Sequence, residues 1–310
     1  MDVSVITVNY KTSDFVIGAI KSLREKSSGF SYEVIVIDNA SGDGSVDAIK
    51  SALPDVRIIE SKENLGTSKA YNLGIRNSYG EYVFIMNPDV EFINNAIYEM
   101  LVFLRAHPDV AIVCGNLYDL DKNPTHSYLL EEFDLDYIRR GASLTHLLSL
   151  RLQKNKFLHQ HNFTNKPIEV GYACAAAMLM RKKDTESIGN FDESIFMYGE
   201  EAVISHKLRE IGLKTVSIPQ PKIIHFEGGS FKTRKSDETS FNQRRYRRFI
   251  DGNYSTFEVL NGSGGGKDYL NILLRNEKKL SRLYRLLGKK NKYWISQEKI
   301  EVITEMIKEK

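Results

Sequence analysis

Short apolar runs alternate with segments of helical periodicity over the first third of the chain. Four runs predict buried strands at residues 3–8, 33–37, 56–59 and 82–86. Helical patterns at 13–26, 42–53 and 66–79 separate them, and a fourth helix at 94–106 precedes a strand at 110–114. This order is typical of βαβ units, which build a mostly parallel sheet flanked by helices.

The pattern is less regular beyond residue 115. Residues 116–168 show no clear period, and we expect a variable, partly helical insertion there. The apolar, small-residue segment 168–180 predicts one buried strand, and a helix is expected at 202–210 before Gly212. A strand at 214–218, a turn at Pro219 and Pro221, and a flexible hinge at 262–266 complete the prediction.

Polar, turn-forming residues follow each of the first four predicted strands. The carboxyl ends of parallel strands share one edge of a sheet, and α/β proteins bind ligands at that edge. The sequence therefore predicts a ligand site there, with Asn87-Pro88-Asp89 as its most informative motif. The four strand ends are Asn9-Tyr10, Asp38-Asn39-Ala40-Ser41, Glu60-Ser61 and Asn87-Pro88-Asp89.

Four acidic residues and one histidine are candidates for chemistry at this site. Asp89 and His225 would offer an oxygen and an imidazole nitrogen to a divalent cation. Glu200 or Glu201, at a predicted helix start, could take a proton from a hydroxyl. Structural alternatives stay open, since glutamates also stabilise helix N-termini and Asp38 could be a turn residue.

Composition describes an ordinary globular protein. The chain has 310 residues, 42% of them hydrophobic, enough for one or two domains. No apolar run approaches the roughly 20 residues that span a bilayer, and Met1-Asp2 leads directly into a strand, so we expect a cytoplasmic protein. Cys114 and Cys174 fit buried apolar positions, and His159 and His161 fit loop histidines better than a metal pair.

Charge is unevenly distributed, although the net charge is only +3. Residues 267–310 carry 12 Lys and Arg against 6 Asp and Glu. No aromatic-interleaved basic motif accompanies them, which disfavours nucleic acid as a partner. Leucines alternate with these cations, as in a basic amphipathic helix. This tail could make peripheral contact with a membrane, or it could pack on the domain with a solvated charged face.

Six motifs, taken in this order, resemble the family 2 glycosyltransferases, and within them the bacterial rhamnosyltransferase-like branch. The resemblance covers about residues 3–235. The joint spacing of the motifs makes it specific for the family and much less specific for the sugar. The motifs are Val5 to Tyr10, Ile37 to Ser45, Asn64-Leu65-Gly66 with Asn72 to Ile75, Asn87-Pro88-Asp89, Phe191-Asp192-Glu193 with Met197 to Glu201, and His225 to Ser230.

The resemblance implies an α/β protein with the GT-A (nucleotide-diphospho-sugar transferase) fold, in which helices flank a mostly parallel central sheet. It implies a GT-A domain at 1–230, with a nucleotide-binding half at 1–90 and an acceptor half at 91–230. A basic, mainly helical C-terminal extension would follow at 231–310.

The implied activity is inverting transfer of a sugar from a nucleotide-diphosphate donor. The acceptor would be a glycan or a lipid-linked saccharide in bacterial surface polysaccharide synthesis. The branch favours dTDP-rhamnose as donor, with UDP-sugars next. The place of reaction would be the cytoplasm or the inner face of the cell membrane.

Site residues follow from the resemblance position by position. Asp89 matches the last Asp of the D-x-D motif that binds Mn²⁺ or Mg²⁺, with help from His225. Glu200-Glu201 matches a Glu-Asp pair whose second member is the general base; because position 201 is Glu here, the base could be Glu201 or Glu200. The donor nucleotide would contact Val8, Asn9, Tyr10, Asp38, Asn64, Gly66, Lys69 and Asn87.

Two other classes of protein stay open from the residues alone. A sugar-nucleotide nucleotidyltransferase would share the sheet, but it should carry a Gly-rich phosphate loop where this chain has Asn9-Tyr10-Lys11-Thr12. A non-catalytic module that binds a sugar nucleotide or glycan would keep the fold and lose the base. The absence of G-x-G-x-x-G and G-x-x-x-x-G-K-S/T runs disfavours dinucleotide dehydrogenases and P-loop enzymes.

Overall fold

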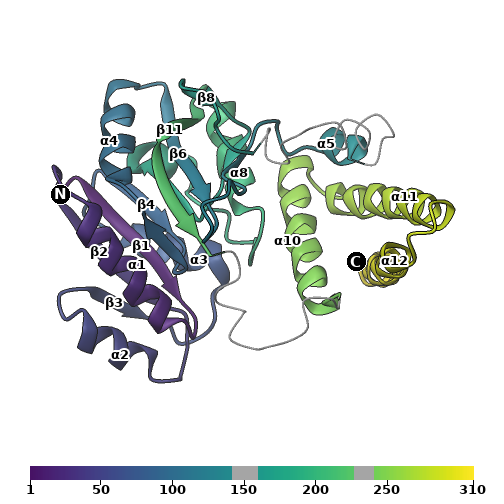
Figure 1. Cartoon of the computed structure of the whole chain (residues 1–310), viewed down its shortest axis with the longest axis horizontal. Coiled ribbons are helices and arrows are strands. Elements are labelled where there is room, and N and C mark those ends of the chain that lie inside the picture. Colours follow the sequence, from purple (N-terminus) through teal and green to yellow (C-terminus); the bar gives the residue numbers. More distant parts are fainter. Residues whose placement is uncertain (142–159, 227–240) are drawn as a thin grey trace. The chain divides into compact units, whose positions relative to one another are not determined.

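The computed structural model describes residues 1–141, 160–226 and 241–310 (Figure 1). The described residues form two compact units. The first unit, residues 1–131, 160–196 and 200–226, contains all the strands of the described chain. The second unit, residues 132–141, 197–199 and 241–310, is helical.

The first unit is built on a large mixed sheet. Its strand order is β3-β2-β1-β4-β10-β6-β11-β5, with β8 paired to β11. The strands are β1 Val3–Asn9, β2 Tyr32–Asp38, β3 Arg57–Glu60, β4 Tyr82–Met86, β5 Val90–Phe92, β6 Val110–Tyr118, β8 Ile168–Glu169, β10 Ala177–Arg181 and β11 Lys214–His225. A separate pair joins β7 (Tyr128–Leu129) to β9 (Tyr172–Ala173). The first four strands are parallel, whereas β10 runs antiparallel to both its neighbours.

Helices cover both faces of this sheet, and the strands supply apolar residues to each face in turn. Along β1, Val3 and Val5 join one apolar core and Ile6 joins the other. The helices that pack in the first core are α1 (Ser13–Lys26), α2 (Ser45–Ala52) and α4 (Ala96–Ala106). Those that pack in the second core are α3 (Gly66–Arg76) and α8 (Glu200–Glu210). Because both faces are buried, the strands read as nearly continuous apolar runs in the sequence.

These elements confirm the α/β fold with a mostly parallel central sheet. The predicted strands and helices of residues 3–114 all occur, with ends that differ by a few residues. The polar strand ends also meet as expected, since Asn9 is paired with Asp38 in the register of β1 and β2.

Two predictions about the second half were wrong. Residues 168–180 form three short strands, β8, β9 and β10, because each pairs with a different partner strand. The turn expected at Pro219 and Pro221 lies inside β11, which passes this point with a shift in its register against β6. A bulge accommodates the missing proline N–H groups without ending the strand.

The second unit has its own apolar core. It contains α5 (Leu135–Arg140), α10 (Gln243–Asn261), α11 (Gly265–Leu286) and α12 (Lys290–Glu309), while a short helix α7 (Lys182–Ser187) belongs to the first unit. Phe257 and Tyr269 stack with ring centroids 4.9 Å apart, and Leu270 and Ile303 are buried beside them. Of the hinge expected at 262–266, residues 262–264 form the short link between α10 and α11, and residues 265–266 begin α11.

Several expectations fall outside the described residues. The boundary expected at 230 and 231, the motif residues Gly228-Gly229-Ser230, and His159 all lie there, so the domain limits stay a prediction. Over the described ranges, no helix has both the length and the apolar character that crossing a membrane requires.

Candidate active site

Asp38, at the carboxyl end of β2, receives hydrogen bonds from two neighbouring segments. Asn9 Nδ2 donates to Asp38 Oδ1 over 2.7 Å, and Ser41 Oγ donates to the same oxygen over 2.6 Å. The backbone N–H of Ser41 donates to Asp38 Oδ2 over 3.1 Å. Asp38 thus organises the turn after β2, and a carboxylate with three bonds has room for about one further donor.

Asn39 connects this turn to the start of α3. Its Nδ2 donates to Asn64 Oδ1 over 3.0 Å and to the carbonyl of Gly66 over 3.2 Å, while its Oδ1 accepts from Leu65 N over 2.8 Å. The backbone N–H of Thr67 then donates to the carbonyl of Phe196 over 2.7 Å. These bonds bring Asn64 and Gly66 to the predicted edge beside Asp38.

Asn87, Asp89 and His225 converge between β4 and the end of β11. His225 Nε2 lies 3.5 Å from Asp89 Oδ1 and 3.4 Å from Asn87 Nδ2. The pairing of β11 with β5 places His225 opposite Val90, the residue after Asp89. The structure therefore brings together an Asp and a His that are far apart in the sequence, as the metal-site prediction requires.

Tyr71, in α3, contacts this cluster and was not predicted as a site residue. Its hydroxyl donates to Asn87 Oδ1 over 3.2 Å. Burial raises the pKa of Tyr71 well above its usual value, and the nearby carboxylates of Glu200, Glu201 and Asp89 raise it further. Tyr71 therefore stays protonated and acts as a hydrogen-bond donor in the middle of these acidic groups.

Glu200 and Glu201 open α8, where carboxylates stabilise the N-terminal end of the helix dipole. Glu200 is buried, and Glu201 is half-buried. Glu201 is thus the more accessible of the two. Both lie close enough to Tyr71 to affect its pKa, which places them near the Asn87 cluster.

Asp89 and His225 together offer a divalent cation an oxygen and a nitrogen ligand. Their side chains are 7% and 12% exposed, and His225 Nδ1 has no hydrogen-bond partner in the described chain. A group of three or more candidate ligands does not occur among the described residues. The two residues fit a cation that takes its remaining ligands from water and a diphosphate.

The other residues predicted to contact the donor differ in their exposure to solvent. Tyr10 is 46% exposed after β1, and Val8 is half-buried within that strand. Lys69 is exposed on α3 and contributes, after Asn72 and Arg76, to the lowered pKa of Glu193.

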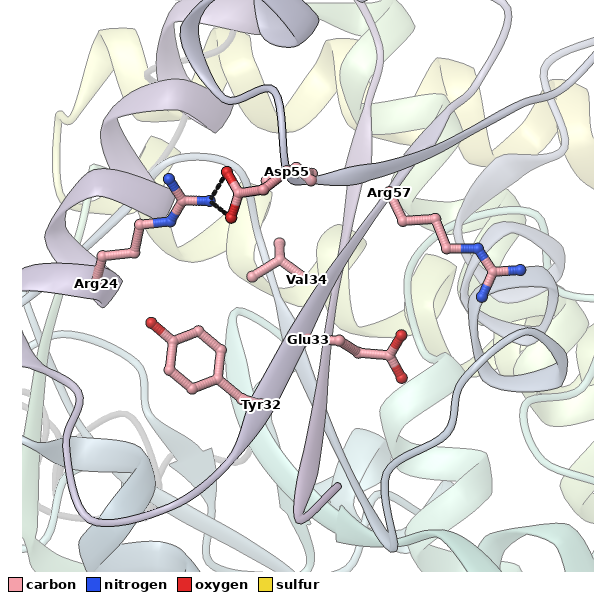
Figure 2. Close-up of a pocket in the computed structure, with 7 residues that line it drawn as sticks. Arg24, Tyr32, Glu33, Val34, Asp55 and Arg57 are labelled. Atoms are coloured by element: carbon pink, nitrogen blue, oxygen red, sulfur yellow. Dashed lines mark hydrogen bonds and ion pairs between the residues drawn. The ribbon is translucent and has the colours of Figure 1, made fainter.

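A hollow of about 410 Å³ lies at the opposite, amino end of β2 and β3 (Figure 2). Its charged groups are already used within the protein. Arg24 Nη2 binds both oxygens of Asp55 at 2.8 Å, Glu33 accepts from Ser4 Oγ over 2.6 Å, and Arg57 Nη1 donates to the carbonyl of Asn77 over 2.7 Å. This hollow is therefore a structural feature of the sheet edge.

Comparison with known protein families identifies the family of this chain. The model of the family described as "Glycosyl transferase family 2" matches residues 4–189. The chain belongs to this family. The two rival classes, a nucleotidyltransferase and a non-catalytic module, are accordingly not favoured.

The relatives of the family 2 chain include two glycan-synthesis enzymes that match most of its length. A low-salt glycan biosynthesis hexosyltransferase, Agl10 of Haloferax volcanii, is 27% identical over 254 residues, which cover 81% of this chain and 73% of the relative. An N-acetylglucosaminyl-diphospho-decaprenol L-rhamnosyltransferase of Mycobacterium tuberculosis is 26% identical, covering 64% of this chain and 67% of the relative.

Solved structures of similar fold include a mannosyltransferase. The mannosyltransferase PcManGT from Pyrobaculum calidifontis, in complex with GDP-Man and Mn²⁺, matches with a TM-score of 0.60 and 15% identity over 98% of this chain and 86% of its own. S. aureus TarS 1-349 matches with a TM-score of 0.54 and 13% identity over 100% of this chain and 92% of its own. The family 2 chain therefore has the GT-A fold.

Sequence reasoning missed Tyr71 and Asn39 for different reasons. Tyr71 lies in the apolar stripe of α3, where an aromatic residue reads as core, and its hydroxyl contact depends on the position of β4. Asn39 was recognised only as a turn residue. Its position directly after Asp38, at a strand end, could have indicated that Asn39 makes hydrogen bonds at the site.

Proposed function

We propose that this protein is an inverting, metal-dependent glycosyltransferase that moves a sugar from a nucleotide-diphosphate donor to a glycan or lipid-linked acceptor. The observation that carries the proposal is the convergence of Asn87, Asp89 and His225, with Tyr71 bonded to Asn87 and its pKa raised by the carboxylates of Glu200 and Glu201. This convergence supports a site in which Asp89 and His225 hold the cation and a nearby glutamate acts as the base.

Donor binding is assigned to the polar edge of the nucleotide-binding half. Asp38, which Asn9 and Ser41 orient, would accept from the imide N–H of a pyrimidine base. Asn64 and Gly66 would lie along the ribose and diphosphate. The sugar would then lie near Asn87, where Tyr71 fixes the side-chain amide.

The reaction would be a single displacement. The acceptor oxygen forms a bond to the anomeric carbon while the bond from that carbon to the diphosphate oxygen breaks, so the configuration inverts. Glu201 takes the proton of the acceptor hydroxyl, and the nucleoside diphosphate leaves with the electron pair. Glu201 is preferred to Glu200 because it is the more exposed of the two.

A divalent cation, Mn²⁺ or Mg²⁺, would offset the negative charge that develops on the leaving diphosphate. Asp89 and His225 are the residues that would hold it, since their Oδ1 and Nε2 atoms face each other at 3.5 Å. The solved mannosyltransferase of similar fold contains Mn²⁺, which supports this assignment.

The donor sugar and the acceptor are assigned from the relatives. The Mycobacterium relative is named an L-rhamnosyltransferase, which supports dTDP-rhamnose as the first donor to test, with UDP-hexoses next. That name also contains a lipid diphosphate, which supports a lipid-linked acceptor.

A thermal-shift panel of dTDP-, UDP- and GDP-sugars with Mn²⁺, followed by product analysis, tests the proposal. We expect Asp89→Ala to lose both the donor-dependent shift and transfer. Glu201→Gln should keep the shift and lose transfer by about 10²- to 10⁴-fold, the usual contribution of a general base. The product of an inverting enzyme has the opposite anomeric configuration to the donor.

Glu200→Gln is the matched control for the base. Normal transfer by Glu201→Gln together with inactive Glu200→Gln would move the base assignment by one residue. A donor that stabilises the wild-type protein without being hydrolysed or transferred to any acceptor would contradict the proposal and favour a binding module.

A further inference from the structure

The turn between α11 and α12 carries a concentration of positive charge. Seven Lys and Arg and no Asp or Glu occur between residues 278 and 297. None of the seven forms an ion pair with any residue that the structure describes. They are Lys278, Lys279, Arg282, Arg285, Lys289, Lys290 and Lys292, and all are exposed.

The other end of this helix pair has its charges neutralised. Arg247 of α10 pairs with Glu305 at 3.6 Å and also with Glu309, and Lys310 pairs with Asp251 at 3.0 Å. Residues 265–277 and 298–310, the parts of α11 and α12 outside the turn, carry 5 Lys and Arg against 6 Asp and Glu. Within this helix pair, the excess of cations is therefore confined to the α11–α12 turn and the helix ends beside it.

Large apolar side chains stand exposed within this basic region. Leu286 is 84% exposed, Trp294 is 65% exposed and Leu287 is 49% exposed. The amphipathic pattern predicted from the sequence begins at Leu270, but Leu270 and Ile272 are buried in the core of the helical unit. Packing therefore explains the early part of the stripe and leaves these three side chains unexplained.

The backbone of the turn is well defined. Gly288 adopts a positive φ of 64°, its N–H donates to the carbonyl of Arg285 over 3.2 Å, and the N–H of Lys289 donates to the carbonyl of Tyr284 over 2.9 Å. These two bonds form a Schellman motif, which ends α11 and starts α12 within a few residues. Ser296 Oγ donates to Glu277 Oε1 over 2.6 Å and ties the two helices together.

We propose that the α11–α12 turn is a docking surface for an anionic lipid bilayer, with Leu286, Leu287 and Trp294 entering the interface and the seven cations facing the lipid headgroups. Cations near an anionic surface each contribute about 1 kcal/mol, and tryptophan favours the boundary between headgroups and acyl chains. The exposed leucines favour a bilayer over nucleic acid as the partner, because a phosphate backbone offers no apolar environment in which leucine side chains could be buried. This inference does not depend on the proposed function.

Trp294 reports on this surface directly, because it is the only tryptophan of the chain. We expect equimolar phosphatidylglycerol and phosphatidylcholine vesicles to shift its emission to the blue. Vesicles of the same composition with brominated acyl chains should quench it. Phosphatidylcholine alone should do neither, and high salt should weaken the response.

Sedimentation with the same anionic vesicles separates the contributions of charge and apolar surface. Lys289, Lys290 and Lys292 changed together to Ser should lower the partition constant about 100-fold. Changing Lys21, Lys166 and Lys183 to Ser removes the same charge from exposed positions elsewhere and should have little effect. Leu286→Ser with Leu287→Ser should lower it at least about tenfold, and the control pair is Leu120→Ser with Ile211→Ser, at exposed positions outside the turn.

Three results would overturn the proposal. They are no blue shift with anionic vesicles, equal losses in the turn variants and their controls, or a tryptophan response to RNA without one to vesicles. The measurements contain no sugar nucleotide, and Asp89→Ala protein should bind vesicles as the wild type does. Failure of the lipid-binding proposal is therefore distinguishable from failure of the proposed enzyme activity.

Discussion

At the residue scale, the structure points to Tyr71 as a positioning residue of the candidate site. Its hydroxyl fixes the amide of Asn87, whose Nδ2 faces His225. Sequence patterns select residues by type and spacing, so they found the carboxylates and the histidine. They did not find Tyr71, because its role depends on which strand lies opposite α3.

We predict that Tyr71→Phe lowers the turnover number about tenfold while the free energy of unfolding falls by only about 1 kcal/mol, the usual value for one hydrogen bond. The reason is that Asn87 loses its fixed orientation beside His225. Steady-state kinetics and urea unfolding measure the two effects. Tyr128→Phe, which changes another buried tyrosine of the same core, is the control and should leave the turnover number unchanged. Equal rates for Tyr71→Phe and wild type would remove Tyr71 from the site.

His161 predicts a dependence of stability on pH. Burial lowers its pKa to about 4 in the folded protein, whereas an unfolded histidine titrates near 6.5. Protonation therefore favours the unfolded chain, and the stability that is present above pH 6.5 is lost as the pH falls toward about 4. The imidazole is 3% exposed, and its Nδ1 lies 3.3 Å from Ser127 Oγ.

We expect the free energy of unfolding of the wild type to fall between pH 6.5 and 4 by about 2 kcal/mol more than that of His161→Gln. Urea titrations at several pH values provide the measurement. His107→Gln, at the end of α4, is the histidine control and should keep the wild-type slope. Parallel curves for wild type and His161→Gln would contradict the assigned cause.

At the scale of elements, the start of α3 is the most constrained point of the site. Gly66 has a φ of +75°, and a Cβ there would lie 2.2 Å from the carbonyl oxygen of Phe196. The same carbonyl accepts from Thr67 N, so neither backbone segment can move away without losing that bond. The close approach requires glycine for reasons of space as well as of conformation.

We predict that Gly66→Ala lowers the free energy of unfolding by about 3 kcal/mol or more and reduces the donor-dependent thermal shift. Gly42→Ala provides the matched control. Gly42 also has a positive φ, of 60°, but no atom lies within 4 Å of its added Cβ, so only the backbone cost of about 1 kcal/mol should appear. Similar destabilisation by the two substitutions would show that the contact with Phe196 is unimportant.

The comparison of predicted and observed elements has a physical explanation. Strands buried on both faces between helices have a strong local signal, so residues 3–114 were predicted well. Residues 168–180 were predicted wrongly, because the composition of a run of small apolar residues does not show whether the run forms one strand or three. The pairing partners of β8, β9 and β10 decide the matter, and these lie far away in the sequence.

At the scale of the whole molecule, family and fold could be predicted from the order of the motifs. The donor sugar could not, since it depends on side chains around the sugar whose positions no motif specifies. The packing of the C-terminal helices was also left open. Leu270 and Leu286 belong to the same apolar pattern, yet one is buried and the other is 84% exposed.

The path of β11 has a consequence for dividing this protein into modules. The family match ends at residue 189, but β11, at residues 214–225, pairs with β6 and β5 and carries His225. A protein cut to the matched segment would expose the unpaired edges of both strands and would lack the imidazole. The smallest part of the chain that can form the complete sheet is thus longer than the segment that identifies the family.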